Sequence, residues 1–243
     1  REAYKNAYAN PLNAGVLSDQ ARSVLNRYNL LKKFADDPAA TLAELHRKAL
    51  QDDRGDILYT LAEGSYLYGS QLGDSYAEEQ QIRAPDYFLL SALYSGYFIT
   101  GERSRQRLNI FDHRSRAAID MYNFGLWQGF TTSGGEGLDL NTAVRKLPLG
   151  SISISLDTSR FPWKMEEFEK FLPADKYAVR GVSVRNRTAG IGVPIIALRK
   201  KSGSGVSGSQ PVPVTAVLRF QGDLAALDAG TATAALEIYS TRD

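Results

Sequence analysis

The side chains that could perform acid–base or metal chemistry are few in this sequence. It contains no cysteine and two histidines, His46 and His113, which excludes thiolate nucleophiles and cysteine-ligated zinc. His46 falls in a predicted helix over residues 38–50, and His113 directly follows Asp112, a predicted helix cap. Neither histidine has a second histidine or a carboxylate at ligand spacing on the same helix face. We therefore predict a surface or capping role for both, no metal site and no bound cofactor.

Three glutamates cluster at Glu166, Glu167 and Glu169, where two carboxylates could serve a glycosidase. That chemistry needs carboxylates about 5–10 Å apart across a cleft. The spacing instead fits a short amphipathic helix within residues 161–171, whose acids are solvated. We therefore predict a structural role for this segment, with three residues packing against the core: Met165, Phe168 and Leu172.

Motifs for nucleotide binding and serine hydrolysis are missing. The glycines in residues 134–137 and 203–208 lack the strand, helix and following lysine of a phosphate-binding loop. No Gly-x-Ser-x-Gly pentapeptide occurs.

The net charge of +2 provides no field that would direct the chain to nucleic acid or an anionic membrane. No apolar run reaches the roughly 18 residues of a transmembrane helix, and we predict neither nucleic-acid binding nor a membrane span.

One loop has the composition of a contact site. Gly190 and Gly192 surround an isoleucine and precede Pro194, so the backbone there can approach another surface closely. Arg185 and Arg187 flank this loop and point to the same side of an extended strand. Two interpretations remain open: a bulged connection between strands, or a loop that touches a ligand or a neighbouring domain.

The first half of the chain has the 3.6-residue periodicity of amphipathic helices. Ser18 is a predicted helix cap, and Asp37 with Pro38 is the predicted start of the next helix. Short polar loops favour antiparallel hairpins, either tetratricopeptide-like or in an irregular bundle. The predicted helices cover residues 18–31, 38–50, 53–69, 85–101 and the region from 112 to about 130.

Tyrosines are frequent in this helical half. Tyrosine is favoured at protein interfaces, because its ring is large and its hydroxyl is polar. We predict that four of these side chains are exposed and serve as candidate anchors for a protein or peptide partner: Tyr66, Tyr76, Tyr87 and Tyr94.

The second half has the alternating pattern of short β-strands. Residues 131–137 contain three glycines and form the predicted link between a helical domain, 1–133, and a β-rich domain, 138–243. The predicted class is α+β, with an N-terminal α-helical bundle of antiparallel hairpins followed by a mainly antiparallel β-sheet or sandwich. A Ser/Gly tract over 202–209 is a predicted hairpin tip. The predicted strands cover residues 151–156, 177–184, 193–199, 212–220 and 232–238.

Several short segments together resemble the N-terminal region of a bacterial family of exported α/β-hydrolase-type, esterase- or lipase-like proteins. They are spread over most of the chain, and none is a catalytic signature. The segments are Leu17-Ser18 before Arg22-Ser23-Val24-Leu25, residues 38–50, Ile119-Asp120-Met121-Tyr122-Asn123, Arg185-Asn186-Arg187, Gly190-Ile191-Gly192-Val193-Pro194, Thr215-Ala216-Val217-Leu218-Arg219-Phe220 and Leu236-Glu237-Ile238-Tyr239.

The resemblance implies that a catalytic α/β-hydrolase domain follows Asp243 and that a signal or lipoprotein peptide precedes Arg1. The protein would then be exported, and either periplasmic or anchored to a membrane through its N-terminus. The present chain would be a non-catalytic accessory module that packs on or shields the hydrolase domain. The alternative is a protein- or peptide-binding scaffold of the cell envelope that uses the tyrosine-rich helical half.

Overall fold

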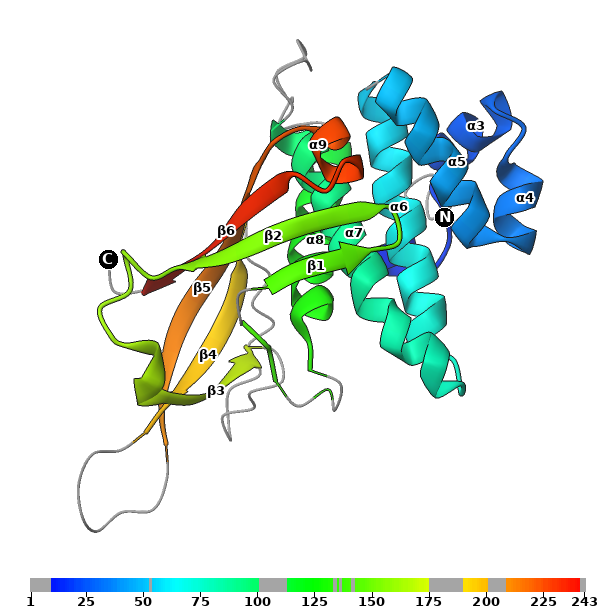
Figure 1. Ribbon diagram of the computed structural model, residues 1–243. Helices are drawn as coiled ribbons and strands as arrows, with labels where there is room; N and C mark the ends of the chain where they lie inside the picture. The colour runs from blue at the N-terminus through cyan, green and yellow to red at the C-terminus, as the bar shows by residue number, and fades with distance from the viewer. Residues whose placement is uncertain are drawn as a thin grey trace.

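The computed structural model describes residues 10–52, 54–100, 113–132, 135, 137–140, 143–174, 190–200 and 209–240. Helices α2 to α8 precede a curled six-stranded sheet, and a short helix, α9, lies between its last two strands in the chain (Figure 1). The predicted α+β class, a helical bundle followed by a mainly antiparallel sheet, is confirmed. None of the described helices is both long enough and apolar enough to cross a bilayer.

The helical half begins with short capped helices and continues into three long ones. Ser18 and Asp37 cap α3 and α5 with their side chains, and Pro38 opens α5, as predicted. The first predicted helix is split into α3 and α4, because Asn29 adopts a left-handed φ of 57°. The helices are α2 (Pro11–Ala14), α3 (Asp19–Arg27), α4 (Leu31–Asp36), α5 (Pro38–Gln51), α6 (Gly55–Gly73), α7 (Glu78–Thr100), α8 (His113–Phe130) and α9 (Leu224–Asp228).

Helix α7 starts at Glu78, so the predicted start at Pro85 is wrong. A proline inside a helix leaves the carbonyl four residues earlier, here that of Gln81, without its helical donor. Residues 76–83 are all exposed, so water can bond this carbonyl and the helix continues through the proline.

Small residues let the long helices α6, α7 and α8 pack at close range. Ser91 Oγ of α7 donates to the Ala62 carbonyl of α6 at 2.8 Å. Gly125 and Gly129 of α8 lie against the backbone of α7. A Cβ atom at Gly125 would stand 2.6 Å from the Phe88 carbonyl oxygen, so only glycine permits this approach.

The sheet has the strand order β1-β2-β6-β5-β4-β3. Neighbouring strands are antiparallel except β2 and β6, which run parallel. Alternate residues of β5 and β6 are buried, so one face of the sheet contributes to the core. The strands are β1 (Ala143–Leu147), β2 (Gly150–Asp157), β3 (Phe168–Pro173), β4 (Val193–Arg199), β5 (Gln210–Gln221) and β6 (Ala232–Ser240).

Four predicted strands occur as β2, β4, β5 and β6, whereas β1 and β3 were not predicted. The predicted strand at 177–184 and residues 202–208 of the predicted hairpin tip lie outside the described residues. The predicted helix within 161–171 is wrong: a 3₁₀ turn, η1 (Met165–Glu167), leads into β3. Pairing with β4 and a cluster of aromatic rings fix this extended conformation; the rings are those of Phe161, Trp163, Phe168 and Phe171.

The helical and β-rich halves share one buried core. Tyr122 of α8 donates its hydroxyl to the Leu218 carbonyl of β5 at 2.6 Å and accepts the Leu218 N–H at 2.9 Å. The pairing of β4 with β5 stops at Ala216, so this hydroxyl takes the place of a strand at Leu218. The ring of Phe220 packs on Gly96 of α7, where a Cβ atom would lie 2.6 Å from the ring.

Candidate functional site

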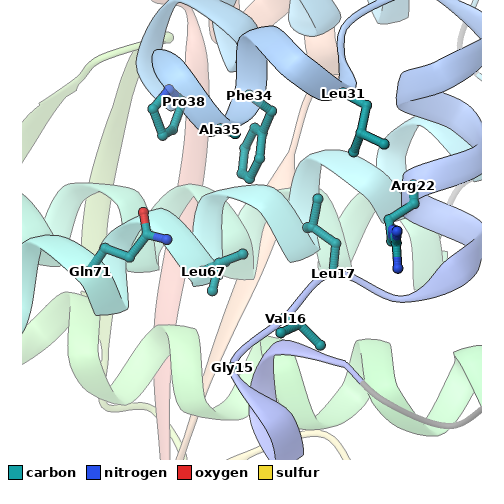
Figure 2. A pocket seen from close by; sticks show the side chains of 10 residues that line it. All are labelled: Gly15, Val16, Leu17, Arg22, Leu31, Phe34, Ala35, Pro38, Leu67 and Gln71. Carbon is teal, nitrogen blue, oxygen red and sulfur yellow. The ribbon is translucent and has the colours of Figure 1, made fainter. Parts of the chain in front are cut away.

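An open groove lies between the short N-terminal helices and α6 (Figure 2). Its volume is about 440 Å³, and most of its surface is apolar. The connector between α2 and α3 forms one wall, α4 the opposite wall, and α6 lies between them. The lining residues are Gly15, Val16, Leu17, Arg22, Leu31, Phe34, Ala35, Pro38, Leu67 and Gln71.

Helical spacing and one left-handed residue place these side chains around the groove. Leu31 and Phe34 are three residues apart and project from one side of α4, while Leu67 and Gln71 are four residues apart on α6. Gly15 ends α2 with a φ of 65°, a conformation that glycine adopts without strain, and turns the chain along the groove. The walls therefore follow from local sequence patterns that converge only in the folded chain.

Two polar side chains stand at opposite ends of the apolar lining, Arg22 on α3 and Gln71 on α6 (Figure 2). The Arg22 side chain is 58% exposed, and its Nη1 lies 3.8 Å from Asp19 Oδ1. An exposed pair at this separation contributes little stability, so the guanidinium can bond a second acid. The groove thus combines an apolar floor with a cation at one end.

A buried acid holds the groove wall from the inside. Glu63 of α6 is completely buried, and its Oε2 accepts the backbone N–H of Ser18 at 2.9 Å. Glu63 lies one turn before Leu67 on the same face of the helix, and Ser18 directly follows the connector. Burial raises the pKa of Glu63, and the hydrogen bonds of Ser18 and Tyr59 partly oppose that shift.

A second buried polar cluster links α5, α7 and α9. The predicted surface or capping role of His46 is wrong, because α9 packs against α5 and covers this histidine. His46 Nδ1 lies 2.7 Å from the Tyr94 hydroxyl, and Nε2 lies 3.6 Å from Asp228 Oδ1. Tyr94 and His46 are both buried, whereas the Asp228 side chain is 57% exposed. We interpret this cluster as structural.

The cluster predicts a pH-dependent stability. Burial lowers the pKa of His46 below its ordinary value, and Asp228 only partly opposes this. The unfolded chain therefore binds more protons than the folded chain at mildly acidic pH. The contribution of neutral, buried His46 to the free energy of unfolding is fully present above about pH 6.5. It is lost as the pH falls from that value through the lowered pKa of His46. In urea unfolding, His46→Gln should show a smaller loss of stability than the wild type between about pH 7.5 and 5.5. Equal losses in both proteins would contradict this assignment.

The loop predicted to touch a ligand or a neighbouring domain contacts other residues of this chain, in α8 and β5. Asn123 of α8 donates its amide to the Gly190 carbonyl at 3.0 Å and accepts the Gly192 N–H at 2.8 Å. Gly192 has a φ of 138°, and a Cβ atom there would lie 2.7 Å from Thr215 Cγ2. Pro194 pairs with Thr215 in the β4–β5 ladder. These contacts support the interpretation as a strand connection; Arg185 and Arg187 lie outside the described residues.

The predicted exposure of the tyrosines is wrong for Tyr87 and Tyr94, which are buried in α7. Tyr66 is only partly buried, but burial raises its pKa to about 12, and its ring packs on Phe88. Tyr76 is fully exposed, at 106% of its reference surface. Of the four candidate anchors, Tyr76 alone has the predicted exposure.

Among the described residues, the remaining candidates for chemistry do not assemble into a site. Glu167 accepts the Lys164 N–H and forms a two-nitrogen ion pair with Arg199, and these bonds, in that order, lower the pKa of Glu167. Within the parts of the chain that the structure describes, no three His, Asp or Glu side chains group so as to hold a metal ion. Residues 101–112 and the side chain of His113 lie outside those parts.

Sequence reasoning missed the groove and its buried acid. Glu63 had a detectable signal, since it is a lone acid within the otherwise uncharged stretch from Ile57 to Leu72 of α6. Nothing in the sequence marks Arg22 as a groove residue, because an arginine on an amphipathic helix is ordinarily solvated. No protein-family model, curated protein or solved structure matches this chain.

Proposed function

We propose that this chain is a non-catalytic binding module whose groove between α3, α4 and α6 holds an apolar side chain of a protein or peptide partner. The observation that carries the proposal is the open apolar groove of about 440 Å³ with Arg22 at one end. Concave apolar surfaces with a few placed polar groups are the usual form of binding sites.

The lining determines which partner segment fits. Val16 is 47% exposed and Ala35 is exposed, so the groove edge offers apolar surface to a partner. Arg22 favours a carboxylate next to the bound apolar residue, because guanidinium–carboxylate bonds are charge-assisted and directional. The expected ligand is therefore a peptide segment with a bulky apolar residue beside an acidic one.

This function is compatible with both predictions made from the sequence. If a hydrolase domain belongs to the same polypeptide, a segment of that domain can occupy the groove, and the chain acts as its accessory module. If the partner is another envelope protein, the chain acts as a scaffold. Export of the protein is part of the same proposal and rests on the resemblance alone.

A groove-filling variant tests the proposal. A displayed random-peptide library would be selected on the wild-type chain, and enriched peptides would be titrated by calorimetry against wild type and Ala35→Trp. Ala35 is exposed on α4, so the indole can enter the groove without disturbing the core. We expect Ala35→Trp to weaken binding by at least about tenfold, the loss of about 1.4 kcal/mol.

The matched control is Ala225→Trp, which adds the same ring at an exposed alanine of α9, away from the groove. It should bind peptides as the wild type does. Equal affinity of the enriched peptides for wild type and Ala35→Trp, or enriched peptides without an apolar residue beside an acid, would contradict the proposal.

A further inference from the structure

The groove wall is bonded to a buried acid, Glu63. We use the name wall segment for Gly15, Val16, Leu17 and Ser18. Its last residue donates its N–H to Glu63 Oε2 at 2.9 Å, and its first residue turns out of α2 with a φ of 65°. Val16, between these points, is 47% exposed. Gly15 is also exposed, whereas Leu17 is buried, so the exposed part of the segment is held at one end by the Leu17 side chain and by the bond at Glu63.

The same bond orients the cation of the groove. Ser18 Oγ caps α3 by accepting the Ala21 N–H at 3.2 Å, and Arg22 follows one turn after Ser18. A shift of Ser18 would therefore move both the wall segment and the start of the helix that carries Arg22. Glu63 is thus a positioning residue for the apolar and the charged parts of the groove.

The choice of an acid at this position is informative. A glutamine would accept the Ser18 N–H with its amide oxygen and would avoid the cost of burying an ionisable group. Glu63 is completely buried, and its second oxygen, Oε1, has no hydrogen-bond partner among the described residues. Unlike a glutamine, the glutamate at this position can change its charge by binding a proton.

The groups that act on Glu63 are few. Ser18 faces it from α3, and Tyr59 faces it from the preceding turn of α6; both favour the ionised form, while burial opposes it. The nearest acid and base in sequence on α3, Asp19 and Arg22, are exposed and paired with each other. The titration of this carboxyl is therefore governed by burial and by the hydrogen bonds of Ser18 and Tyr59.

We propose that the protonation state of Glu63 controls the wall segment, so that the groove is held in its binding shape when Glu63 is ionised and loosens when it is protonated. The physical reason is that an N–H bond to a carboxylate is about twice as strong as one to a neutral acceptor. The part of this inference that concerns ligand affinity rests on the proposed binding function. The motion of the wall segment does not.

The direction of the pH dependence follows from the burial of Glu63. Because burial raises the pKa of this carboxyl, protonation begins at a higher pH than for an exposed glutamate. The wall segment should therefore be ordered above the raised pKa and become mobile as the pH falls through it. Peptide affinity should fall over the same range.

A spin label on the wall segment tests the motion without any ligand. The chain has no cysteine, so Val16→Cys gives a single attachment point for a nitroxide. We expect the mobile fraction of its electron paramagnetic resonance spectrum to rise at least about threefold as Glu63 is protonated. A label at Val144→Cys, an exposed valine of β1, is the matched control and should show no such change.

Two substitutions separate the charge of Glu63 from the bond that it makes. Glu63→Gln keeps an acceptor for Ser18 but cannot titrate, so the label at position 16 should lose its pH response. Ser18→Pro removes the N–H donor at a φ of −62°, which proline adopts, and should leave the label mobile at every pH. Ser18→Ala removes the hydroxyl that caps α3 and that acts on Glu63, but it keeps the N–H donor and should retain the pH response. A wild-type response in Glu63→Gln would overturn the inference.

Peptide titrations then distinguish failure of this inference from failure of the proposed function. If peptides bind and Ala35→Trp abolishes binding, but affinity has the same pH profile in wild type and Glu63→Gln, the groove function stands and control by Glu63 is refuted. If the label responds through Glu63 but no peptide binds, the wall motion stands and the binding function is refuted. We expect about a fivefold loss of affinity on protonation in the wild type alone.

Discussion

Gly125→Ala should lower the free energy of unfolding by about 2–3 kcal/mol, the range of severe overpacking. The added Cβ atom would lie 2.6 Å from the Phe88 carbonyl oxygen and 3.0 Å from the Ala92 backbone nitrogen. Both atoms belong to the backbone of α7, so no side chain can rotate to relieve the clash, and α8 must move away. Replacing a glycine inside a helix by alanine would by itself stabilise the folded state by about 1 kcal/mol. A net loss of stability in Gly125→Ala must therefore come from the clash with α7.

The experiment is thermal unfolding followed by circular dichroism, where a loss of this size lowers Tm by roughly 4–12 °C in a domain of this length. Gly73→Ala is the control, because the nearest atom to its added Cβ is a side-chain carbon at 3.8 Å. It should be neutral or slightly stabilising. A Gly125→Ala protein as stable as Gly73→Ala would show that α7 and α8 are not in close contact.

Tyr122→Phe should destabilise the protein by about 2–4 kcal/mol, although it removes one oxygen atom. That oxygen bonds both the carbonyl and the N–H of Leu218, and burial raises the pKa of Tyr122 well above the ordinary value for tyrosine. The phenylalanine variant leaves two buried backbone groups of β5 without partners. An unpaired buried polar group costs more than the net gain from its hydrogen bond.

Urea unfolding would measure this loss, with Tyr76→Phe as control, because Tyr76 is fully exposed. Because the Tyr122 hydroxyl bonds α8 to β5, the variant also tests whether the helical and β-rich halves unfold together. The two tryptophans offer separate probes: Trp127 is in α8, and Trp163 packs on Phe168 of β3. Coincident transitions at both probes in the wild type are expected, and a Tyr122→Phe variant with wild-type stability would rule out the bridging role.

Much of the fold was predictable, because helix caps and residue periodicity act locally. Ser18, Asp37 and the alternation in β5 and β6 were interpreted correctly from short windows. Errors arose where distant segments decide the outcome. His46 is buried by α9, and the segment after Met165 is extended because it pairs with β4. Neither partner is adjacent in sequence.

The candidate site was less predictable than the fold. Its walls come from three segments that meet only after α3 and α4 fold back on α6, so no single pattern marks them. The burial of two tyrosines, by contrast, was predictable from their spacing in the sequence. Tyr87 and Tyr94 are seven residues apart and therefore on one face of α7, the face that the structure buries. Residue type suggested an interface, while spacing indicated the core.

The position of β6 has a consequence for how the protein is made. It follows the other five described strands in the chain but lies between β2 and β5, so the β1–β2 and β4–β5 hairpins remain separate sheets until it is added. The contacts of α6, α7 and α8 are sequential and can form earlier during synthesis. A nascent chain that stalls before residue 232 would therefore present two open strand edges to other chains beside a folded helical half.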